Sequence, residues 1–213
     1  MKRKLIILGA SGFAHEVAWL VSDINKAGQS VTWDIVGFVD RNPKWIGKNL
    51  NGIPIISLEQ ATYHLPDIYA VAAIGGPLAR ERAVTEAEEL GFKFATLIHP
   101  TVLMDSNTIE IDAGSMICAG NILTVNIRIG KHVLLNLDCT VGHDSVLEDY
   151  ASVAPGCHLS GNTTLRRSSY LGTGVVMIEK TEVGAYSVIG AGAVVVRNIP
   201  SRVTAVGIPA KVR

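Results

Sequence analysis

Two adjacent side chains in the segment LNLDCTVGHDSVLEDYASVAPGC (residues 135–157), His143 and Asp144, place an imidazole beside a carboxylate. Histidine changes charge near neutral pH, so a positioned imidazole can remove a proton from an amine or hydroxyl that attacks a carbonyl. A neighbouring carboxylate favours the protonated ring and makes it a stronger base. The alternative is a solvated surface pair without a task. Weaker candidates for the same role are His99, His132 and His158.

A second set of candidates lies near the start of the chain, where the apolar run KLIIL is followed by GASG and a helical pattern. In a parallel sheet, ligands bind at the carboxyl ends of strands, where glycine lets the backbone approach a phosphate. Three such ends qualify, at residues 9–12, at Asp40 and at Gly75 with Gly76. Asp40 could accept hydrogen bonds from a ribose or sugar hydroxyl. We therefore predict nucleotide or nucleotide-sugar binding, although GASGFA is not a full GxGxxG motif and such a turn is often only a turn.

The elements that would position this second set alternate between strand and helix patterns. Strands are expected at residues 4–8, 34–40, 52–56 and 68–75, and helices at 13–28, 57–65 and 77–91. This alternation predicts a small parallel sheet covered by helices, a Rossmann-like α/β domain. A redox dinucleotide fold would usually need more strands, so NAD binding remains a weaker alternative.

The elements that would position His143 follow a six-residue period. Every sixth residue from Ile111 to Val195 is aliphatic or Met, fifteen in a row, and the residues four positions later are mostly small or β-branched. Such a unit cannot bury its apolar side alone, but three units closing a triangular coil stack into a continuous core. The period predicts a β-helix with eighteen residues a coil.

The period also predicts which side chains point inward. His143 and Asp144 fall at a corner and face outward, and Asn136 occupies the neighbouring corner of the same coil. Cys139 lies under Cys157 in the interior column, where both thiols are expected to be small core residues. Glycine follows the aliphatic residue at five corners, where we expect unusual backbone angles: Gly130, Gly142, Gly172, Gly184 and Gly190.

Composition limits the partners of the protein. The 213 residues are 48% hydrophobic and carry nineteen basic and nineteen acidic side chains, so no net field attracts nucleic acid or an anionic membrane. The apolar run at Leu5–Leu8 is too short for a signal core or a membrane span, which favours the cytoplasm. Three cysteines without CxxC spacing predict neither a disulfide framework nor a metal site.

Four features together resemble one family: the strand-GASG-helix start, LIHP at residues 97–100, the hexapeptide array with NLDCTVGHD, and AVGIPAKVR at residues 205–213. The chain is similar to the bacterial sugar acyltransferases of the sialic acid O-acetyltransferase type, which include N-acetyltransferases of nucleotide-linked 4-amino sugars. The resemblance implies a nucleotide-sugar-binding α/β domain at residues 1–97 and a left-handed parallel β-helix with a C-terminal tail at 98–213. It also implies a homotrimer with acetyl-CoA in the clefts between prisms.

The resemblance implies roles for individual residues. His143 corresponds to the general base of the family and Asp144 to the acid that raises its basicity. With this base, we expect the sugar amine to attack the thioester directly, without an acyl-enzyme intermediate. Contacts to the nucleotide sugar map to Ser11, Gly12, Phe13, Asp40 and Gly75, with Asn136 beside the base, and contacts to acetyl-CoA map near Ser152, Thr173 and Ala191.

Three alternatives stay open at the level of sequence. Several family members carry histidine in the front glycine loop where this chain has Phe13, with His15 two residues later, so the nucleobase is not identified. The acceptor could be a hydroxyl of sialic acid or of another sugar instead of an amine. A non-catalytic trimeric protein that binds sugar nucleotides is the alternative outside the enzymes.

Overall fold

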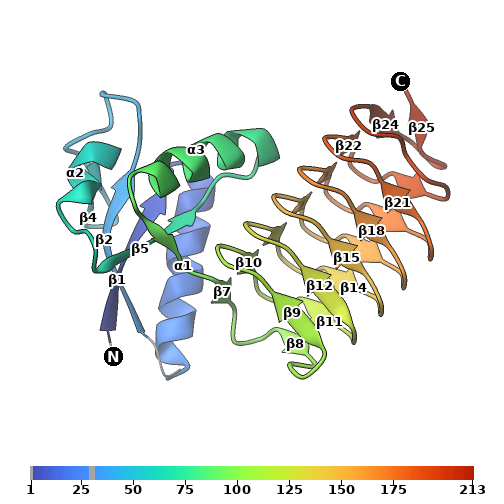
Figure 1. The fold of residues 1–213 in the computed structure, drawn as a ribbon, viewed down its shortest axis with the longest axis horizontal. Coiled ribbons are helices and arrows are strands. Elements are labelled where there is room, and N and C mark those ends of the chain that lie inside the picture. The colour runs from blue at the N-terminus through green and yellow to red at the C-terminus, as the bar shows by residue number, and fades with distance from the viewer. Residues whose placement is uncertain (1, 29–31) are drawn as a thin grey trace. The chain divides into compact units, whose positions relative to one another are not determined.

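The computed structural model describes residues 2–28 and 32–213, and the chain divides into two compact units (Figure 1). The first comprises Met1–Gly75 and Ala79–Thr96, and the second comprises Gly76–Leu78 and Leu97–Arg213. The first is an α/β unit and the second a β-helix. The predicted fold class, a Rossmann-like domain followed by a hexapeptide-repeat β-helix, is confirmed.

The α/β unit is built on one twisted sheet of six strands in the order β3-β4-β2-β1-β5-β6. All neighbours run parallel except β3 and β4, an antiparallel hairpin that the sequence analysis did not predict. The central strand β1 carries four consecutive buried residues at Leu5–Leu8. The strands of this sheet are β1 (Lys2–Leu8), β2 (Thr32–Val39), β3 (Asn49–Leu50), β4 (Ile53–Ile56), β5 (Ile68–Ala72) and β6 (Lys93–Phe94).

Three helices connect these strands: α1 (Gly12–Lys26), α2 (Leu58–Thr62) and α3 (Pro77–Glu89). Helix α1 buries one stripe at helical spacing, Ala14, Val17, Leu20, Val21 and Ile24. Helix α2 begins with a capping box, in which the side chains of Ser57 and Gln60 each accept a hydrogen bond from the other residue's backbone N–H. The strands and helices predicted between residues 4 and 91 are therefore confirmed in type.

The β-helix has three sides, each a sheet of two- and three-residue strands that run parallel except for β25 at the end of the first side (Figure 1). The first side contains β7 (Leu97–Ile98), β10 (Met116–Ile117), β13 (Leu134–Leu135), β16 (Ser152–Val153), β19 (Tyr170–Leu171), β22 (Val188–Ile189), β24 (Thr204–Val206) and an antiparallel β25 (Lys211–Val212). The second side contains β8 (Leu103–Met104), β11 (Ile122–Leu123), β14 (Thr140–Val141), β17 (His158–Leu159), β20 (Val176–Met177) and β23 (Val194–Val195). The third side contains β9 (Ile109–Ile111), β12 (Ile127–Ile129), β15 (Val146–Leu147), β18 (Thr164–Leu165) and β21 (Glu182–Val183).

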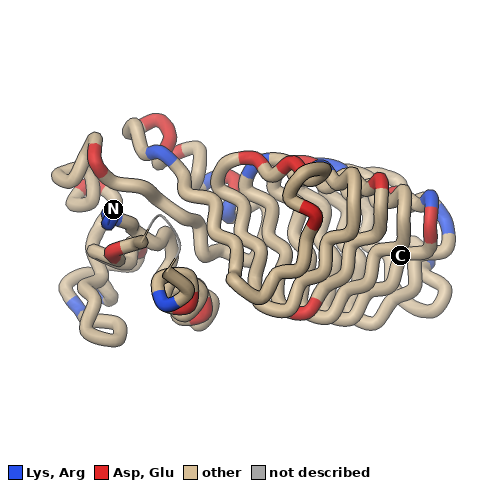
Figure 2. Tube along the Cα trace, turned by 90° about the horizontal axis from the view of Figure 1, so that it is seen from below, with Lys and Arg blue, Asp and Glu red and all other residues tan. Residues whose placement is uncertain are grey.

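The register between coils is eighteen residues, as the six-residue period predicts. Leu135 pairs with Val153, Val141 with Leu159 and Leu147 with Leu165. Fourteen of the fifteen periodic residues are buried, and Ile111 at the open end of the array is half-buried. Apolar burial therefore fixes the coil-to-coil register. The charged residues of the β-helix lie on its surface, and in Figure 2 most of them follow one long side of it.

The corners correct one expectation. The five corner glycines have ordinary backbone angles, and the positive φ values fall two positions later, for example at His132 (55°), Asp144 (59°) and Tyr186 (61°). The glycines serve close packing instead, because a Cβ on Gly142 would lie 2.5 Å from the backbone nitrogen of Gly161. The predicted unusual angles at Gly130, Gly142, Gly172, Gly184 and Gly190 are therefore wrong.

Candidate functional site

The His143 and Asp144 side chains form a hydrogen-bonded pair at the corner that follows β14. Nδ1 of His143 lies 2.7 Å from Oδ2 of Asp144, and the two side chains are 59% and 47% exposed. The pair faces outward as predicted, because Val141 takes the inward position two residues before His143. The left-handed backbone at Asp144 turns its carboxylate back beside the ring. The ring is thus held by one nitrogen and open to solvent.

The charge of this pair follows from its hydrogen bonds. The hydrogen bond from His143, and then the one from Asn126, lower the pKa of the Asp144 carboxyl below its ordinary value. The carboxylate is therefore ionised across the neutral range. An ionised Asp144 accepts a hydrogen bond from Nδ1–H, which leaves the Nε2 lone pair of a neutral imidazole available to take a proton. Chemically, this arrangement can serve as a base whose ring is oriented by a carboxylate.

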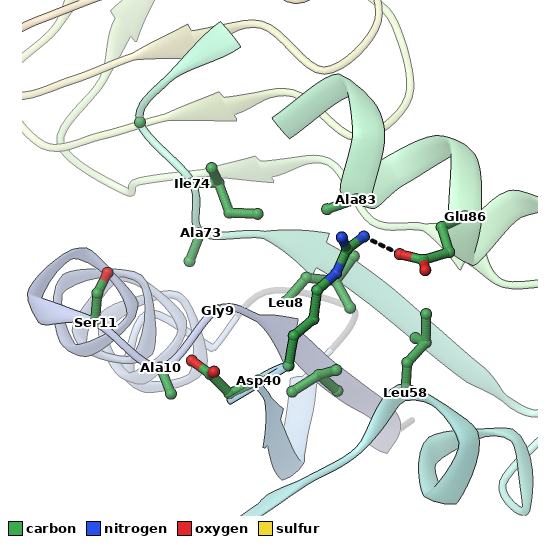
Figure 3. Close-up of a pocket in the computed structure, with 13 residues that line it drawn as sticks. Leu8, Gly9, Ala10, Ser11, Asp40, Leu58, Ala73, Ile74, Ala83 and Glu86 are labelled. Atoms are coloured by element: carbon green, nitrogen blue, oxygen red, sulfur yellow. Dashed lines mark hydrogen bonds and ion pairs between the residues drawn. The ribbon is translucent and has the colours of Figure 1, made fainter. Parts of the chain in front are cut away.

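A pocket of about 340 Å³ lies at the carboxyl ends of β1, β2 and β5 within the α/β unit (Figure 3). Gly9 and Ser11 line it from the turn after β1, Asp40 from the end of β2, and Gly75 from the segment after β5. Pockets of this size and position in parallel sheets accommodate nucleotides and other small ligands. The three predicted strand ends therefore meet in one cavity.

Two local features shape this pocket. Gly9 has a φ of 111°, and a Cβ there would lie 3.0 Å from the carbonyl oxygen of Ala73, so the turn after β1 can take only glycine without strain. Arg80 on α3 is 1% exposed, and its guanidinium donates to the carbonyl oxygens of Ile74 (2.8 Å) and Gly75 (3.2 Å). This buried arginine fixes the segment between β5 and α3.

The polar side chains of the pocket carry both signs of charge. Oδ1 of Asp40 accepts a hydrogen bond from the backbone N–H of Asn42 at 2.8 Å, which fixes the carboxylate at the end of β2. Arg41 forms an ion pair with Glu86 of α3, drawn as a dashed line in Figure 3. Apolar lining comes from Leu58 and Ala83. The pocket can therefore offer an acceptor, a cation and an apolar wall to one ligand.

The structure brings together only part of the predicted set. Ser11, Asp40 and Gly75 line the pocket, whereas Gly12 and Phe13 do not. Gly12 is the exposed first residue of α1, and Phe13 is half-buried on the same helix. The sequence analysis missed Arg41, Glu86, Leu58 and Ala83. Leu58, Ala83 and Glu86 lie on α2 and α3, far along the chain from the predicted residues. Arg41 could have been predicted from the sequence, because it directly follows the predicted residue Asp40.

The residues predicted to contact acetyl-CoA lie at another part of the β-helix from His143. Thr173 and Ala191 are exposed and stack one coil apart at the corner that follows the first side. Asn136 lies at that same corner, and its Oδ1 accepts a hydrogen bond from the N–H of Leu137 at 2.8 Å. Ser152 is on the first side itself and is 1% exposed. Within one chain, strand β14 separates Asn136 from His143.

The remaining histidines are less suited to act as bases. His99 is buried, with Nδ1 2.8 Å from the hydroxyl of Thr101. His132 is buried and stacks on Tyr150 with ring centroids 5.1 Å apart. His158 is exposed, and Nδ1 lies 3.0 Å from the hydroxyl of Thr140 on the neighbouring strand. His143, by contrast, is exposed and pairs with the carboxylate of Asp144.

The cysteines occupy the interior, as predicted. Cys139 and Cys157 are fully buried one coil apart, and their thiols donate to the carbonyl oxygens of Ala154 (3.3 Å) and Gly172 (3.2 Å). The hydrogen bond with Cys157, together with burial, raises the pKa of the Cys139 thiol above its ordinary value. This thiol is therefore protonated and unreactive at neutral pH.

Neither a membrane span nor a metal-binding group is found in the part of the chain that the structure describes. None of its helices has the length and apolar character needed to cross a bilayer. Residues 2–28 and 32–213 contain no cluster of three or more His, Cys, Asp or Glu side chains arranged to hold a metal ion.

Comparison with known proteins gives matches over both units. Residues 4–87 match the PglD N-terminal domain family. Over nearly the whole chain, the sequence is 28% identical to GDP-perosamine N-acetyltransferase from Escherichia coli O157:H7, covering 96% of this chain and 94% of that protein.

Solved structures extend the match to the whole fold. The acetyltransferase domain of PglB from Neisseria gonorrhoeae FA1090, in complex with acetyl coenzyme A, is 32% identical, with a TM-score of 0.87 over 100% of both chains. A mutant of perosamine N-acetyltransferase from Caulobacter crescentus, in complex with CoA and GDP-perosamine, is 25% identical, with a TM-score of 0.85 over 99% of this chain and 96% of that one.

Proposed function

The chain belongs to the hexapeptide-repeat sugar N-acetyltransferases that carry a PglD N-terminal domain, and from this membership we propose that it acetylates the amino group of a nucleotide-linked amino-deoxy sugar with acetyl-CoA. The observation that carries the proposal is the exposed His143–Asp144 pair on a β-helix corner. Two similar proteins, from Escherichia coli O157:H7 and Caulobacter crescentus, are named as N-acetyltransferases of perosamine, which is such a sugar. The solved structure of the second contains CoA and GDP-perosamine.

The proposed reaction uses His143 as general base. The neutral sugar amine attacks the thioester carbonyl of acetyl-CoA, and Nε2 of His143 takes the amine proton as the C–N bond forms. The C–S bond then breaks and CoA leaves as a thiolate, which acquires a proton on release. Asp144 keeps Nδ1 protonated and stabilises the imidazolium that forms, because its carboxylate is ionised and hydrogen-bonded to the ring. The product carries an amide in place of the amine.

The pocket of the α/β unit supplies the proposed recognition of the nucleotide. The backbone N–H groups at the start of α1, next to Ser11, suit a diphosphate, because a helix N-terminus attracts negative charge. Oδ2 of Asp40 can accept a hydrogen bond from a ribose hydroxyl, since Oδ1 already binds the N–H of Asn42. Arg41 can exchange its partner Glu86 for a phosphate.

We further propose that the active enzyme is a homotrimer. His143 and the acetyl-CoA candidates Thr173 and Ala191 lie at different corners, so a neighbouring copy is needed to bring both into one cleft. The three sides of the prism differ in a way that suits this packing. The third side and its edge carry ion pairs, such as Arg166 with Glu148 and Glu182, whereas the second side exposes Leu103 (65%) and Ile122 (42%). The apolar side would face the partner.

The oligomeric state is tested with a charge on that apolar side. Wild-type protein should have the mass of three chains in light scattering. Ile122→Arg should dissociate it and lower turnover at least tenfold, while nucleotide binding by the α/β unit persists in calorimetry. Glu110→Arg, on the third side, is the matched control and should stay trimeric. A monomeric and active wild-type protein would contradict the proposal.

The reaction itself is tested by product analysis. Purified protein is incubated with acetyl-CoA and a panel of nucleotide-linked amino sugars that includes GDP-perosamine, and products are weighed by mass spectrometry. We expect one acetyl group on one member of the panel, and we expect that bond to survive hydroxylamine, which cleaves esters but not amides. Acetylation of free sialic acid alone, or an ester product, would show an O-acetyltransferase. Nucleotide binding without any CoA release would show a non-catalytic protein. The cytoplasmic location predicted from the sequence stays a prediction.

A further inference from the structure

The backbone of the His143–Asp144 pair is held from both neighbouring coils. The N–H of Asp144 donates to the carbonyl oxygen of Val125 in the coil before it at 3.2 Å. The carbonyl oxygen of His143 accepts from the N–H of Asn162 in the coil after it at 2.7 Å. The eighteen-residue register therefore gives each of the two residues a fixed neighbour on either side.

The Asp144 side chain has a partner in the coil before it. Nδ2 of Asn126, eighteen residues earlier, donates to Oδ1 of Asp144 at 3.2 Å, while Oδ2 binds the ring of His143 at 2.7 Å. Both carboxylate oxygens are thus occupied, which fixes the plane of the carboxylate and hence the ring. The backbone of Asn126 is itself anchored, because its N–H donates to the hydroxyl of Thr108 at 3.1 Å.

The His143 ring has a matching neighbour in the coil after it. A Cβ on Gly161, eighteen residues later, would lie 2.5 Å from Nε2, 2.7 Å from Cε1 and 2.9 Å from Cδ2 of His143. The ring therefore occupies the space that any other residue at 161 would fill. The backbone conformation at position 161 does not require glycine, since its φ is not positive. The absence of a side chain is what the ring requires.

We propose that Asn126 and Gly161 are positioning residues for the reaction, Asn126 by clamping Asp144 and Gly161 by leaving room for the His143 ring. The inference rests on the proposed function of His143 as general base. It adds two residues from the neighbouring coils, neither of which supplies a group that gives or takes a proton in the reaction. The site would thus be a stack of three coils and not a single corner.

A purely conformational role for Asn126 makes a different prediction. Its φ is 54°, a backbone region that Asn, Asp and Gly tolerate better than other residues. If conformation alone matters, Asn126→Asp and Asn126→Gly should both behave as wild type. If the amide clamps Asp144, Gly removes the donor, and Asp replaces the donor with a carboxylate that repels Asp144. The clamp therefore predicts that Asp is at least as damaging as Gly.

The test measures steady-state kinetics of the full-length variants with acetyl-CoA and the member of the nucleotide-linked amino-sugar panel that the wild-type protein acetylates. We expect Asn126→Gly to lower kcat about tenfold and Asn126→Asp to lower it at least as much, with both KM values within about twofold of wild type. Asn162→Gly is the matched control, because Asn162 occupies the same column with a φ of 56°. The substitution keeps the backbone N–H that donates to His143 and removes a side chain that takes no part in the hydrogen bonds of Asp144 with Asn126 and His143. It should keep wild-type kcat.

Gly161→Ala tests the other half of the proposal. We expect a loss of about a hundredfold in kcat with an unchanged melting temperature, because the flexible ring moves aside and the backbone does not. In a His143→Ala background the same substitution should cost nothing further, since it acts only through the ring. A loss that persists without the ring would show a different role and overturn this half.

The outcomes separate the inference from the function beneath it. If His143→Ala is inactive while Asn126→Asp and Gly161→Ala turn over like wild type, the positioning roles are wrong and the base assignment stands. If His143→Ala keeps wild-type turnover, the base assignment is wrong and the positioning roles fall with it.

Discussion

The two units of this protein place their functional side chains by different means. In the β-helix, His143, Asp144 and their neighbours Asn126 and Gly161 are set by a constant spacing, because each coil repeats the one before it after eighteen residues. In the α/β unit, the pocket residues Asp40 and Glu86 come from separate elements that meet only because the sheet order brings β2 and β5 to either side of β1.

This difference has a consequence for how each unit tolerates change. A corner side chain of the β-helix can be replaced without disturbing the buried columns, so its chemistry and the stability of the coil are separable. The pocket of the α/β unit is walled by buried groups such as Arg80, whose guanidinium holds the segment at Gly75. Recognition and stability are therefore linked in the first unit and separate in the second.

The largest effect is expected at the β-helix corner. His143→Ala should lower kcat by about 100- to 10,000-fold, the range for a positioned general base, because the variant lacks the imidazole that takes the amine proton. The melting temperature should change little and nucleotide affinity should not change, since the side chain is 59% exposed and lies outside the α/β unit. Turnover assays and calorimetry on the same preparation measure both. Near-normal turnover by the folded variant would break the separation.

A core substitution should give the opposite pattern. Leu147→Ala removes a fully buried side chain from the interior column between Ile129 and Leu165, and should cost about 2 to 5 kcal/mol of stability. Thermal unfolding measures this loss. Below the melting temperature, kcat should stay within severalfold of wild type. A variant that kept its stability but lost turnover would show that the column does more than support the corner.

The α/β unit should respond in substrate affinity. Asp40→Ala should raise KM for the nucleotide sugar about ten- to a hundredfold, because a charged hydrogen-bond acceptor is lost, and should change kcat little. The KM for acetyl-CoA should remain the same. Asp67→Ala, an exposed aspartate outside the pocket, is the matched control. Equal KM values for the two variants would remove Asp40 from the site.

The smallest effect concerns pH and Asp144. The hydrogen bonds to His143 and Asn126 lower the pKa of the Asp144 carboxyl in the folded state. The stability that this carboxylate contributes is therefore fully present above the ordinary aspartate pKa of about 3.9. It is lost as the pH falls through the lower pKa of the folded state. The melting-temperature difference between wild type and Asp144→Asn should therefore be constant from about pH 5 to 8 and shrink only below about pH 4. A difference that disappears near pH 6 would contradict the assignment.

Sequence reasoning succeeded where one local rule repeats. The six-residue series that includes Leu135, Val141 and Leu147 predicted the β-helix, its register and the outward direction of His143, because each coil must bury the same positions. It erred on the corner glycines. The need for glycine at Gly142 comes from the backbone of the next coil, a contact between residues nineteen apart that no local preference encodes.

By itself the sequence determined the two kinds of unit, the buried columns, the exposed His-Asp pair and the strand end at Asp40, because periodic burial and strand-turn-helix patterns are short-range properties of the chain. Only the tertiary structure decided that Glu86 and Arg41 form an ion pair in the lining of the pocket, that Asn126 holds Asp144, and that Gly161 makes room for the ring. These contacts join residues from separate elements or coils, and a side chain that is merely exposed in its own segment acquires a partner only when folding brings that partner beside it.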